Sequence, residues 1–208
     1  MSQVTVRRLA ILEPTSVFVL IMAYIWSLRD LHPGFWVAIF AMMLLSHVLR
    51  RERAETLGFR LANLQECLQE FGPALIFCAL LLLVCGLLFQ TTRQIGFERA
   101  VLSWAGYLPW GLFQQYILNG YFMTRFDTLV SRRTAPVAAA ALFSGAHLPN
   151  WFLMAVTLIL GYCCALVYRR YKNLYFLAIA HATIGFLLYL VVPDSISHHL
   201  TVGPGWFR

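Results

Sequence analysis

The sequence predicts an all-α protein, a polytopic transmembrane bundle of about seven spans with one amphipathic helix at the membrane interface. Of its 208 residues, 60% are hydrophobic and only 12% are charged, and the mean hydropathy is +0.70. A soluble domain has roughly 45–50% apolar and about 25% charged residues. So few charges cannot cover an apolar core with a water-facing shell. The composition therefore excludes a soluble enzyme, a disordered chain and a secreted disulfide scaffold.

Each predicted span is an apolar stretch approaching the roughly 20 residues that a membrane-crossing helix needs. Seven such stretches follow one another: Pro14–Leu28, Gly34–Leu49, Phe71–Phe89, Val101–Met123, Thr134–Leu148, Trp151–Tyr168 and Asn173–Pro193. Between the second and the third, Arg50–Gln69 carries leucines at positions 57, 61, 64 and 68. Leucines three and four residues apart predict an amphipathic helix that lies at the interface rather than across it.

The chain is expected to form a single integral membrane domain over residues 1–208. Residues 1–49 hold the first two spans, and residues 50–70 hold the amphipathic helix. Residues 71–193 form the core helices that carry the motif residues, and residues 194–208 form an extramembrane tail. The five cysteines have no CxxC spacing, which favours packing over disulfide or metal binding.

The net charge of +7 comes from short cationic clusters between the apolar stretches, which is typical of membrane topology and not of nucleic-acid binding. Alternating the loops assigns twelve cations to one side: Arg7, Arg8, Arg50, Arg51, Arg53, Arg60, Arg125, Arg132, Arg133, Arg169, Arg170 and Lys172. The other side receives four: Arg29, Arg93, Arg99 and Arg208. This bias predicts a cytoplasmic N-terminus. The compact length suggests a prokaryotic inner-membrane protein.

Polar residues interrupt three of the predicted spans. The fourth span holds Gln114, Gln115 and Asn119, the fifth holds His147, and the seventh holds His181. At 1.5 Å per residue, Gln114, His147 and His181 lie about 15, 21 and 12 Å from the cytoplasmic ends of their helices. All three depths fall near the middle of a hydrocarbon core about 30 Å thick.

Polar side chains inside a membrane are costly and face the bundle interior, so their shared depth predicts one buried site. Gln115 and Asn119 are four residues apart and share a helix face, whereas Gln114 points about 100° away. A plainer alternative is that these amides and imidazoles only link helices by hydrogen bonds. If a metal such as zinc binds, His147 and His181 are the candidate ligands, but the spans supply no carboxylate as a third.

In order along the chain, these segments resemble the CAAX protease and bacteriocin-processing (CPBP, or Abi) family, whose members include type II CAAX prenyl endopeptidases. The family has EExxxR, FxxxH and HxxxN motifs on successive helices. Here Gln114 to Asn119 keeps the first spacing, Phe143 to His147 matches the second, and His181 begins the third. Residues 57–60 (LGFR) resemble the family's LGxR element, and the likeness spans about residues 50–192.

The resemblance implies an intramembrane protease, in which a motif glutamate activates water and the two histidines and the asparagine assist. This chain departs from the motif, because Gln114 and Gln115 replace both glutamates, Asn119 replaces the arginine, and Gly185 replaces the final asparagine. A glutamine has no proton to exchange and cannot be a general base. Losing both acids and the arginine together leaves a neutral polar site, which costs less in lipid than an orphaned charge.

Two functions follow from this pattern. The first is an endopeptidase that cleaves a membrane-associated protein or peptide near its C-terminus or leader. In it His147 or His181 holds the water, and Gln114 and Gln115 orient it or donate to the oxyanion. Asn119 is the remaining candidate catalytic residue. The second is a catalytically inactive relative that binds a membrane peptide, lipidated tail or partner protein in the same cavity. Transport, a structural role and a serine mechanism through Ser144 are further alternatives. The expected partners are membrane lipids and a membrane-associated substrate, with no nucleic acid.

Overall fold

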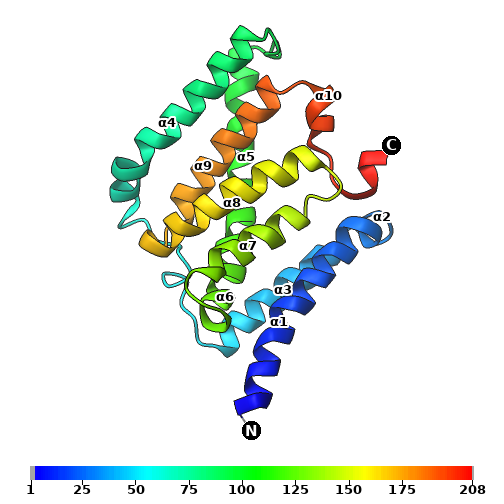
Figure 1. The fold of residues 1–208 in the computed structure, drawn as a ribbon, viewed down its shortest axis with the longest axis vertical. Coiled ribbons are helices and arrows are strands. Elements are labelled where there is room, and N and C mark those ends of the chain that lie inside the picture. The colour runs from blue at the N-terminus through cyan, green and yellow to red at the C-terminus, as the bar shows by residue number, and fades with distance from the viewer. Residues whose placement is uncertain (1–2, 208) are drawn as a thin grey trace.

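The structure is a computed structural model that describes residues 3–207, with side chains from Ala10 onward. Within this range it consists of helices and turns without a β-strand, so the all-α prediction is confirmed. The elements are α1 (Gln3–Ala23), η1 (Tyr24–Leu28), α2 (Arg29–Leu31), α3 (Phe35–Leu49), α4 (Leu64–Leu88), α5 (Phe97–Gln115), η2 (Tyr116–Met123), α6 (Thr124–Leu129), α7 (Thr134–Gly145), α8 (Trp151–Tyr171), α9 (Leu174–Val191), α10 (Asp194–Ser197), η3 (His198–Leu200) and η4 (Gly203–Phe207). Figure 1 shows their arrangement.

Each of the seven predicted spans falls on a helix. Four segments are long and apolar enough to cross a membrane: Ala10–Leu31, Leu64–Leu88, Trp151–Tyr171 and Leu174–Val191. Two other apolar helices, α3 and α7, are shorter. The fourth predicted span lies in a continuous helical run formed by α5, η2 and α6. A count of seven spans remains a prediction.

The prediction of an amphipathic helix over Arg50–Gln69 is wrong. Residues 50–63 form turns, and regular helix begins only at Leu64, from which α4 runs on without a break to Leu88. The periodic leucines do not share a buried face, since Leu57 is 6% exposed and Leu61 is 69% exposed. Their spacing was therefore compatible with a helix without requiring one.

Tertiary hydrogen bonds account for this difference. Gly58 has a φ of +101°, which a glycine tolerates and which interrupts a right-handed helix. The carbonyl of Gly58 accepts from the backbone N–H of Leu174 at 2.8 Å, and the carbonyl of Leu57 accepts from the Tyr168 hydroxyl at 2.9 Å. These carbonyl groups accept hydrogen bonds from the junction between α8 and α9. Long-range contacts therefore keep residues 50–63 in turns instead of a helix.

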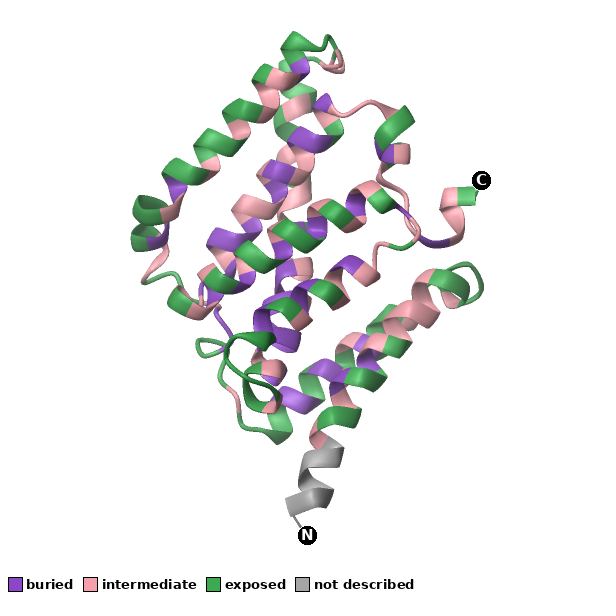
Figure 2. Cartoon of the chain, in the orientation of Figure 1, coloured by how far each residue is buried: buried purple, intermediate pink, exposed green. Residues whose placement is uncertain are grey.

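The core is centred on η2 and the helices around it. Helix α9 packs against α4 and α5, and α7 packs against α8. Buried positions concentrate on η2 and α9, whereas the outer face of α4 is largely exposed (Figure 2). That exposed face is rich in leucine, including Leu80 and Leu81, as expected of a surface in contact with lipid.

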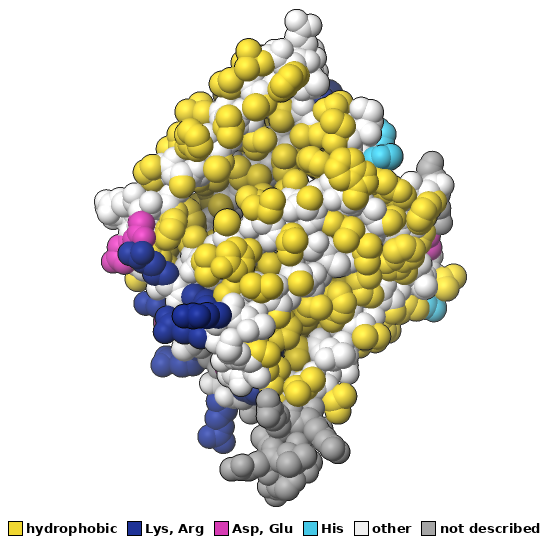
Figure 3. All heavy atoms as spheres, viewed as in Figure 1, with side chains coloured by type: hydrophobic (Ala, Val, Ile, Leu, Met, Phe, Trp, Pro, Cys, Tyr) yellow, Lys and Arg dark blue, Asp and Glu magenta, His cyan; other side chains and the backbone are white. Residues whose placement is uncertain are grey.

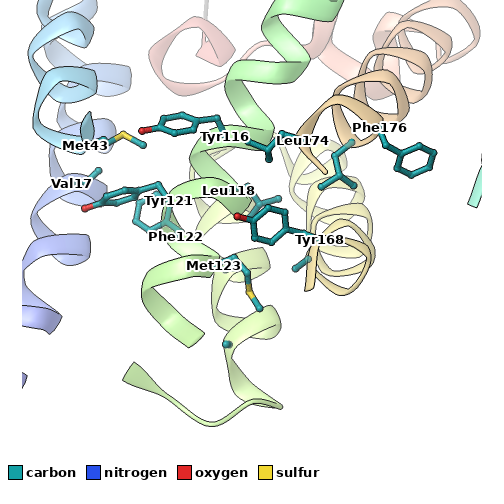
Figure 4. Close-up of a cluster of buried hydrophobic side chains, with 14 of the residues drawn as sticks. Val17, Met43, Tyr116, Leu118, Tyr121, Phe122, Met123, Tyr168, Leu174 and Phe176 are labelled. Atoms are coloured by element: carbon teal, nitrogen blue, oxygen red, sulfur yellow. The ribbon is translucent and has the colours of Figure 1, made fainter. Parts of the chain in front are cut away.

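The π-helical geometry of η2 turns two tyrosines toward the N-terminal helices. Hydrogen bonds in a π-helix join residues five apart, so Tyr116 and Tyr121 lie on one face. Both project toward α1 and α3 (Figure 4), and each ring lies 5.7 Å from the ring of His47. The wide turn thus connects the core with the N-terminal hairpin, the name used here for α1 to α3.

A buried ion cluster pins one end of this hairpin. Arg125 on α6 is 2% exposed, and its guanidinium donates to Glu13 Oε1 at 2.9 Å and to Glu52 Oε1 at 2.8 Å. It also donates to Ser46 Oγ at 2.9 Å, while His47 Nδ1 lies 2.5 Å from Glu52 Oε2. The ion cluster is defined as these five residues.

The ion cluster corrects two sequence interpretations. Arg125 was counted as a loop cation that reports topology, but it is a buried partner of two carboxylates. Glu13 was not expected within a span, yet it lies in the candidate span Ala10–Leu31. A charge of each sign in this position is tolerated because the two groups are paired and hydrogen-bonded.

The basic loops, defined as residues 50–63, 130–133 and 169–173, gather at one end of the molecule. Arg169 donates to the carbonyl of Arg132, and Asn173 Nδ2 donates to the carbonyl of Arg60 at 2.7 Å. Figure 3 shows lysine and arginine side chains clustered at this end of an otherwise apolar face. The side chains of Arg7, Arg8 and Arg208, which the topology count also used, lie outside the described residues.

Candidate functional site

Three of the predicted site residues form one buried hydrogen-bonded cluster. Gln115 closes α5, Asn119 lies in η2, and His181 lies in the middle of α9. Asn119 Nδ2 donates to Gln115 Oε1 at 2.7 Å, and Gln115 Nε2 lies 3.1 Å from His181 Nδ1. The side chains of Gln115 and Asn119 belong to residues 2% and 0% exposed. The predicted spans that hold Gln115 and His181, α5 and α9, therefore meet at this cluster.

The hydrogen bonds assign the state of each group. An amide nitrogen only donates, so His181 Nδ1 accepts from Gln115 and the proton of the neutral ring is on Nε2. Gln115 Nε2 also approaches Cys164 Sγ on α8 at 3.8 Å. Both ends of the Gln115 amide are thus engaged. Asn119 Oδ1 is buried without a hydrogen-bond partner among the described residues.

His147 lies just beyond the end of α7 and is oriented by its own turn. Its Nδ1 is 2.7 Å from the carbonyl oxygen of Phe143, so Nδ1 carries the proton and donates it. Nε2 then keeps its lone pair in the neutral ring. The Phe143 ring stands edge-on to both imidazoles, with centroids 4.9 Å from His147 and 6.3 Å from His181. The phenylalanine of the FxxxH spacing therefore contacts both histidines.

A cavity of about 670 Å³ lies between the N-terminal hairpin and the helices from α5 to α7. The hairpin side of the lining is largely apolar and aromatic, and includes Phe18, Ile21, Trp36, Phe40 and Met43. The opposite side includes Trp110, Phe113, Gln114, Leu118, Phe143 and His147. The volume of the cavity is in the range of small-molecule sites, which are about 300–1,000 Å³.

The five predicted residues therefore divide into two groups. Gln114 and His147 line the cavity, whereas Gln115, Asn119 and His181 are not in its lining and form the hydrogen-bonded cluster behind it. The buried Gln114 Oε1 has no hydrogen-bond partner within the described residues. Successive helical residues point roughly 100° apart, which explains why Gln114 faces the cavity and Gln115 faces the cluster.

The side chains present do not fit a metal ion. His147 and His181 supply two nitrogen ligands, while zinc sites in proteins use three or four. No group of three or more histidine, cysteine, aspartate or glutamate side chains suited to a metal occurs in the part of the chain that the structure describes.

Several neighbours of the site were not identified from the sequence. Tyr107 packs beside His181 with ring centroids 6.0 Å apart, and Cys164 approaches Gln115. Neither carried a motif signal, because their proximity depends on how α5 and α8 pack. Ser144, considered as a nucleophile, donates its hydroxyl to the carbonyl of Met154 at 2.8 Å. This bond does not support a serine mechanism.

The fold and the site define a helical membrane protein with a neutral polar cluster beside an apolar cavity. Residues 97–187 match the family model for type II CAAX prenyl endopeptidases, described as Rce1-like. The match runs from α5 into α9 and includes all five predicted site residues. Over this segment the chain is similar to the Rce1-like family, which is consistent with a CPBP family protease, and the predicted resemblance is confirmed there.

No curated protein and no solved structure matches the chain. The Rce1-like family is generally one of membrane-embedded proteases, and the match supports an intramembrane protease at the family level. The apolar helices and the family together indicate an integral membrane protein in contact with lipids and, in general, with a protein or peptide substrate.

Proposed function

We propose that the chain is a CPBP-type intramembrane endopeptidase that cleaves a membrane-associated protein or peptide near its C-terminus or leader. The observation that carries this proposal is that His147 and Gln114, both in the segment that matches the Rce1-like family, border one cavity. An extended peptide placed in this cavity would bring a scissile amide next to both side chains.

In this proposal His147 is the general base. Its Nδ1–H donates to Phe143, so Nε2 is free to take a proton from a water molecule as the water oxygen attacks the peptide carbonyl carbon. The imidazolium then returns that proton to the leaving amine when the C–N bond breaks. Gln114 Oε1 has no hydrogen-bond partner among the described residues. In the proposal it accepts a hydrogen bond from the other O–H of the water and so orients the nucleophile.

The cluster behind the cavity acts on positioning. Gln115 joins His181 and Asn119 into one chain of hydrogen bonds across α5, η2 and α9. Such a chain holds the helix backbone beside Gln114 in one geometry, and preorganisation of this kind favours the transition state. We assign the cluster to positioning because its members do not line the cavity.

For the cellular setting, we propose a prokaryotic inner membrane with the N-terminus and the basic loops in the cytoplasm. The support is the gathering of lysine and arginine side chains at one end of the molecule (Figure 3), where hydrogen bonds join the basic loops. Reporter fusions at the two termini test this orientation directly.

The experiment compares the peptide termini in membranes of cells that produce the wild type or His147→Ala. Loss of a defined set of new termini with His147→Ala is expected, while protein level and membrane insertion stay the same. His199→Ala is the matched control, because His199 is exposed in the C-terminal segment and is not in the cavity lining. Termini that are identical for wild type and His147→Ala would contradict the proposal.

A second candidate function is supported by the hydrogen bonds of Gln115. Both ends of its amide are occupied, and the cavity lining contains no carboxylate among the described residues. An inactive relative that binds a membrane peptide, lipidated tail or partner protein would need no base. In that case His147→Ala changes no termini, and Gln114→Leu weakens capture of the bound molecule.

Restoring the acids separates the two functions further. If the scaffold is dormant, Gln114→Glu combined with Gln115→Glu introduces carboxylates where the family has them and produces cleavage that the wild type lacks. If the wild type is already a protease through His147, the same double substitution changes its pH profile and does not create activity from none.

A further inference from the structure

The two ends of the cavity differ in chemistry. At the end toward the basic loops, Met43 and Phe122 line it, and the next turn of α3 carries Ser46 and His47 of the ion cluster. These residues and Arg125 are packed to 9% exposure or less. A molecule in the cavity therefore meets a closed, hydrogen-bonded floor at this end.

At the opposite end the lining includes Arg29, the only charged side chain among the described lining residues. Its side chain is 42% exposed. Its ion-pair partner Asp30 approaches with Oδ1 at 3.9 Å from Arg29 Nε, which is too long for a hydrogen bond. The guanidinium N–H groups can therefore donate to an anionic group as an additional partner at the open end of an apolar chamber.

Tryptophans mark this end as a membrane interface. Trp26, Trp36 and Trp151 are between 37% and 59% exposed. They lie near the ends of their helices, on the side where Gly203 N donates to the carbonyl of Leu148. Exposed tryptophans collect at the level of lipid headgroups. Arg29 is thus placed where a phosphate would be found.

The length of the cavity matches the acyl region of one leaflet. From Phe18 to Arg29, both in the lining, the helix advances eleven residues, or about 16 Å at 1.5 Å per residue. Half of a hydrocarbon core about 30 Å thick is about 15 Å. A chain with its headgroup at Arg29 would reach the floor formed at Met43 and Phe122.

We propose that the cavity is a binding site for one acyl chain of an anionic phospholipid, with the lipid phosphate paired to Arg29. The aromatic lining surrounds the chain, and the cation selects the headgroup. The site goes beyond the proposed function, since it requires no catalysis. A lipid bound there fills the space beside Gln114 and His147, and a peptide must displace it to reach them.

The test measures quenching of tryptophan fluorescence in the detergent-solubilised full chain. Phosphatidylglycerol with brominated acyl chains is titrated at low mole fraction, and phosphatidylcholine with the same chains is titrated in parallel. Trp36 and Trp110 line the cavity and report on bromine inside it. Saturable quenching is expected with phosphatidylglycerol at about tenfold or greater affinity over phosphatidylcholine, as for loss of one charge-assisted pair.

Arg29→Gln is expected to remove this preference, and Arg29→Lys to retain most of it. Arg99→Gln is the matched control, because Arg99 is exposed near the start of α5 and is outside the cavity lining. Melting temperatures of all variants show whether each is folded. Equal affinity of the wild type for both lipids overturns the proposal. So does an equal loss of the preference for phosphatidylglycerol in Arg29→Gln and Arg99→Gln.

Two competitors distinguish other occupants. Glycerol phosphate alone should not displace the lipid, and full displacement by it would show an anion site without an acyl chain. An apolar peptide with a free carboxylate should compete no better than phosphatidylglycerol. Tighter binding of that peptide, lost in Arg29→Gln, would show that the site serves peptide and overturn the lipid assignment.

Discussion

Replacing Arg125 with methionine tests whether the ion cluster holds the N-terminal hairpin on the core. The guanidinium is 2% exposed and donates to Glu13, Glu52 and Ser46. Methionine fills similar space but takes the guanidinium away from two carboxylates, leaving Glu13 with Arg50 and Glu52 with His47 as their remaining partners. Removing one partner of a buried ion pair costs about 3–5 kcal/mol.

The expected shift in melting temperature follows from this cost. For a chain of 150–250 residues, 1 kcal/mol corresponds to about 2–4 °C, so Arg125→Met should lower the melting temperature by about 6–20 °C. The assay is thermal unfolding in detergent followed by tryptophan fluorescence. Arg133→Met is the matched control and should shift it by no more than about 2 °C, because Arg133 is exposed.

A rescue variant checks the physical cause. Combining Arg125→Met with Glu13→Gln and Glu52→Gln removes the two carboxylate charges that Arg125 neutralised and should recover at least half of the loss. If Arg125→Met melts within about 2 °C of the wild type, the cluster does not anchor the hairpin. If the triple variant is no better than Arg125→Met, loss of charge pairing is not the reason for the destabilisation.

Glu52, in the loop after α3, should make this stabilisation depend on pH. Burial acts to raise the pKa of Glu52, but hydrogen bonds from Arg125 and His47 outweigh it and hold the pKa below its ordinary value of 4.5. A lowered folded pKa gives stability that is present above 4.5 and lost as the pH falls through the folded value. The melting temperature of the wild type should drop in this acidic window, and that of Glu52→Gln should drop less.

Two other predictions concern separate contacts. The Arg93 guanidinium hydrogen-bonds Asp194 and lowers the pKa of that carboxyl below 3.8, so the contact is present above pH 3.8 and is lost as the pH falls through the lower folded value. Hydrogen exchange of residues 194–207 should rise in that window for the wild type and be insensitive to it in Asp194→Asn. Gly185→Ala should destabilise by about 1–3 kcal/mol, because the added Cβ would lie 2.7 Å from the Tyr107 ring. Gly106→Ala has nothing within 4 Å and should be neutral or slightly stabilising, and the opposite order of the two would refute the packing argument.

Helical geometry alone made part of the candidate site predictable. Gln115 and Asn119 were expected on one face because they are four residues apart, and their side chains do hydrogen-bond at 2.7 Å. Gln114 was expected to point elsewhere, and it borders the cavity. The estimated depth of His181 in its span was close to that of the glutamines, and His181 on α9 does contact Gln115. The catalytic roles of these residues remain predictions.

Other features required contacts between distant segments. His147 and His181 were assigned to one chamber, but only His147 lines the cavity, although the Phe143 ring contacts both imidazoles. The side of a helix that each imidazole faces depends on packing angles, which residue spacing does not encode. The turns at residues 50–63 likewise depend on hydrogen bonds to the α8–α9 junction.

Composition and spacing were enough to establish an all-α membrane protein and to identify an uncharged polar cluster in its helices. Apolar surface and backbone hydrogen bonding impose those features locally, whatever the neighbours are. Which polar groups meet, where the cavity lies and how Arg125 is buried were decided by the tertiary structure. Those features arise from side chains more than 60 residues apart, such as Arg125 with Glu13 and Gln115 with His181, and only packing of the complete bundle brings them within hydrogen-bonding distance.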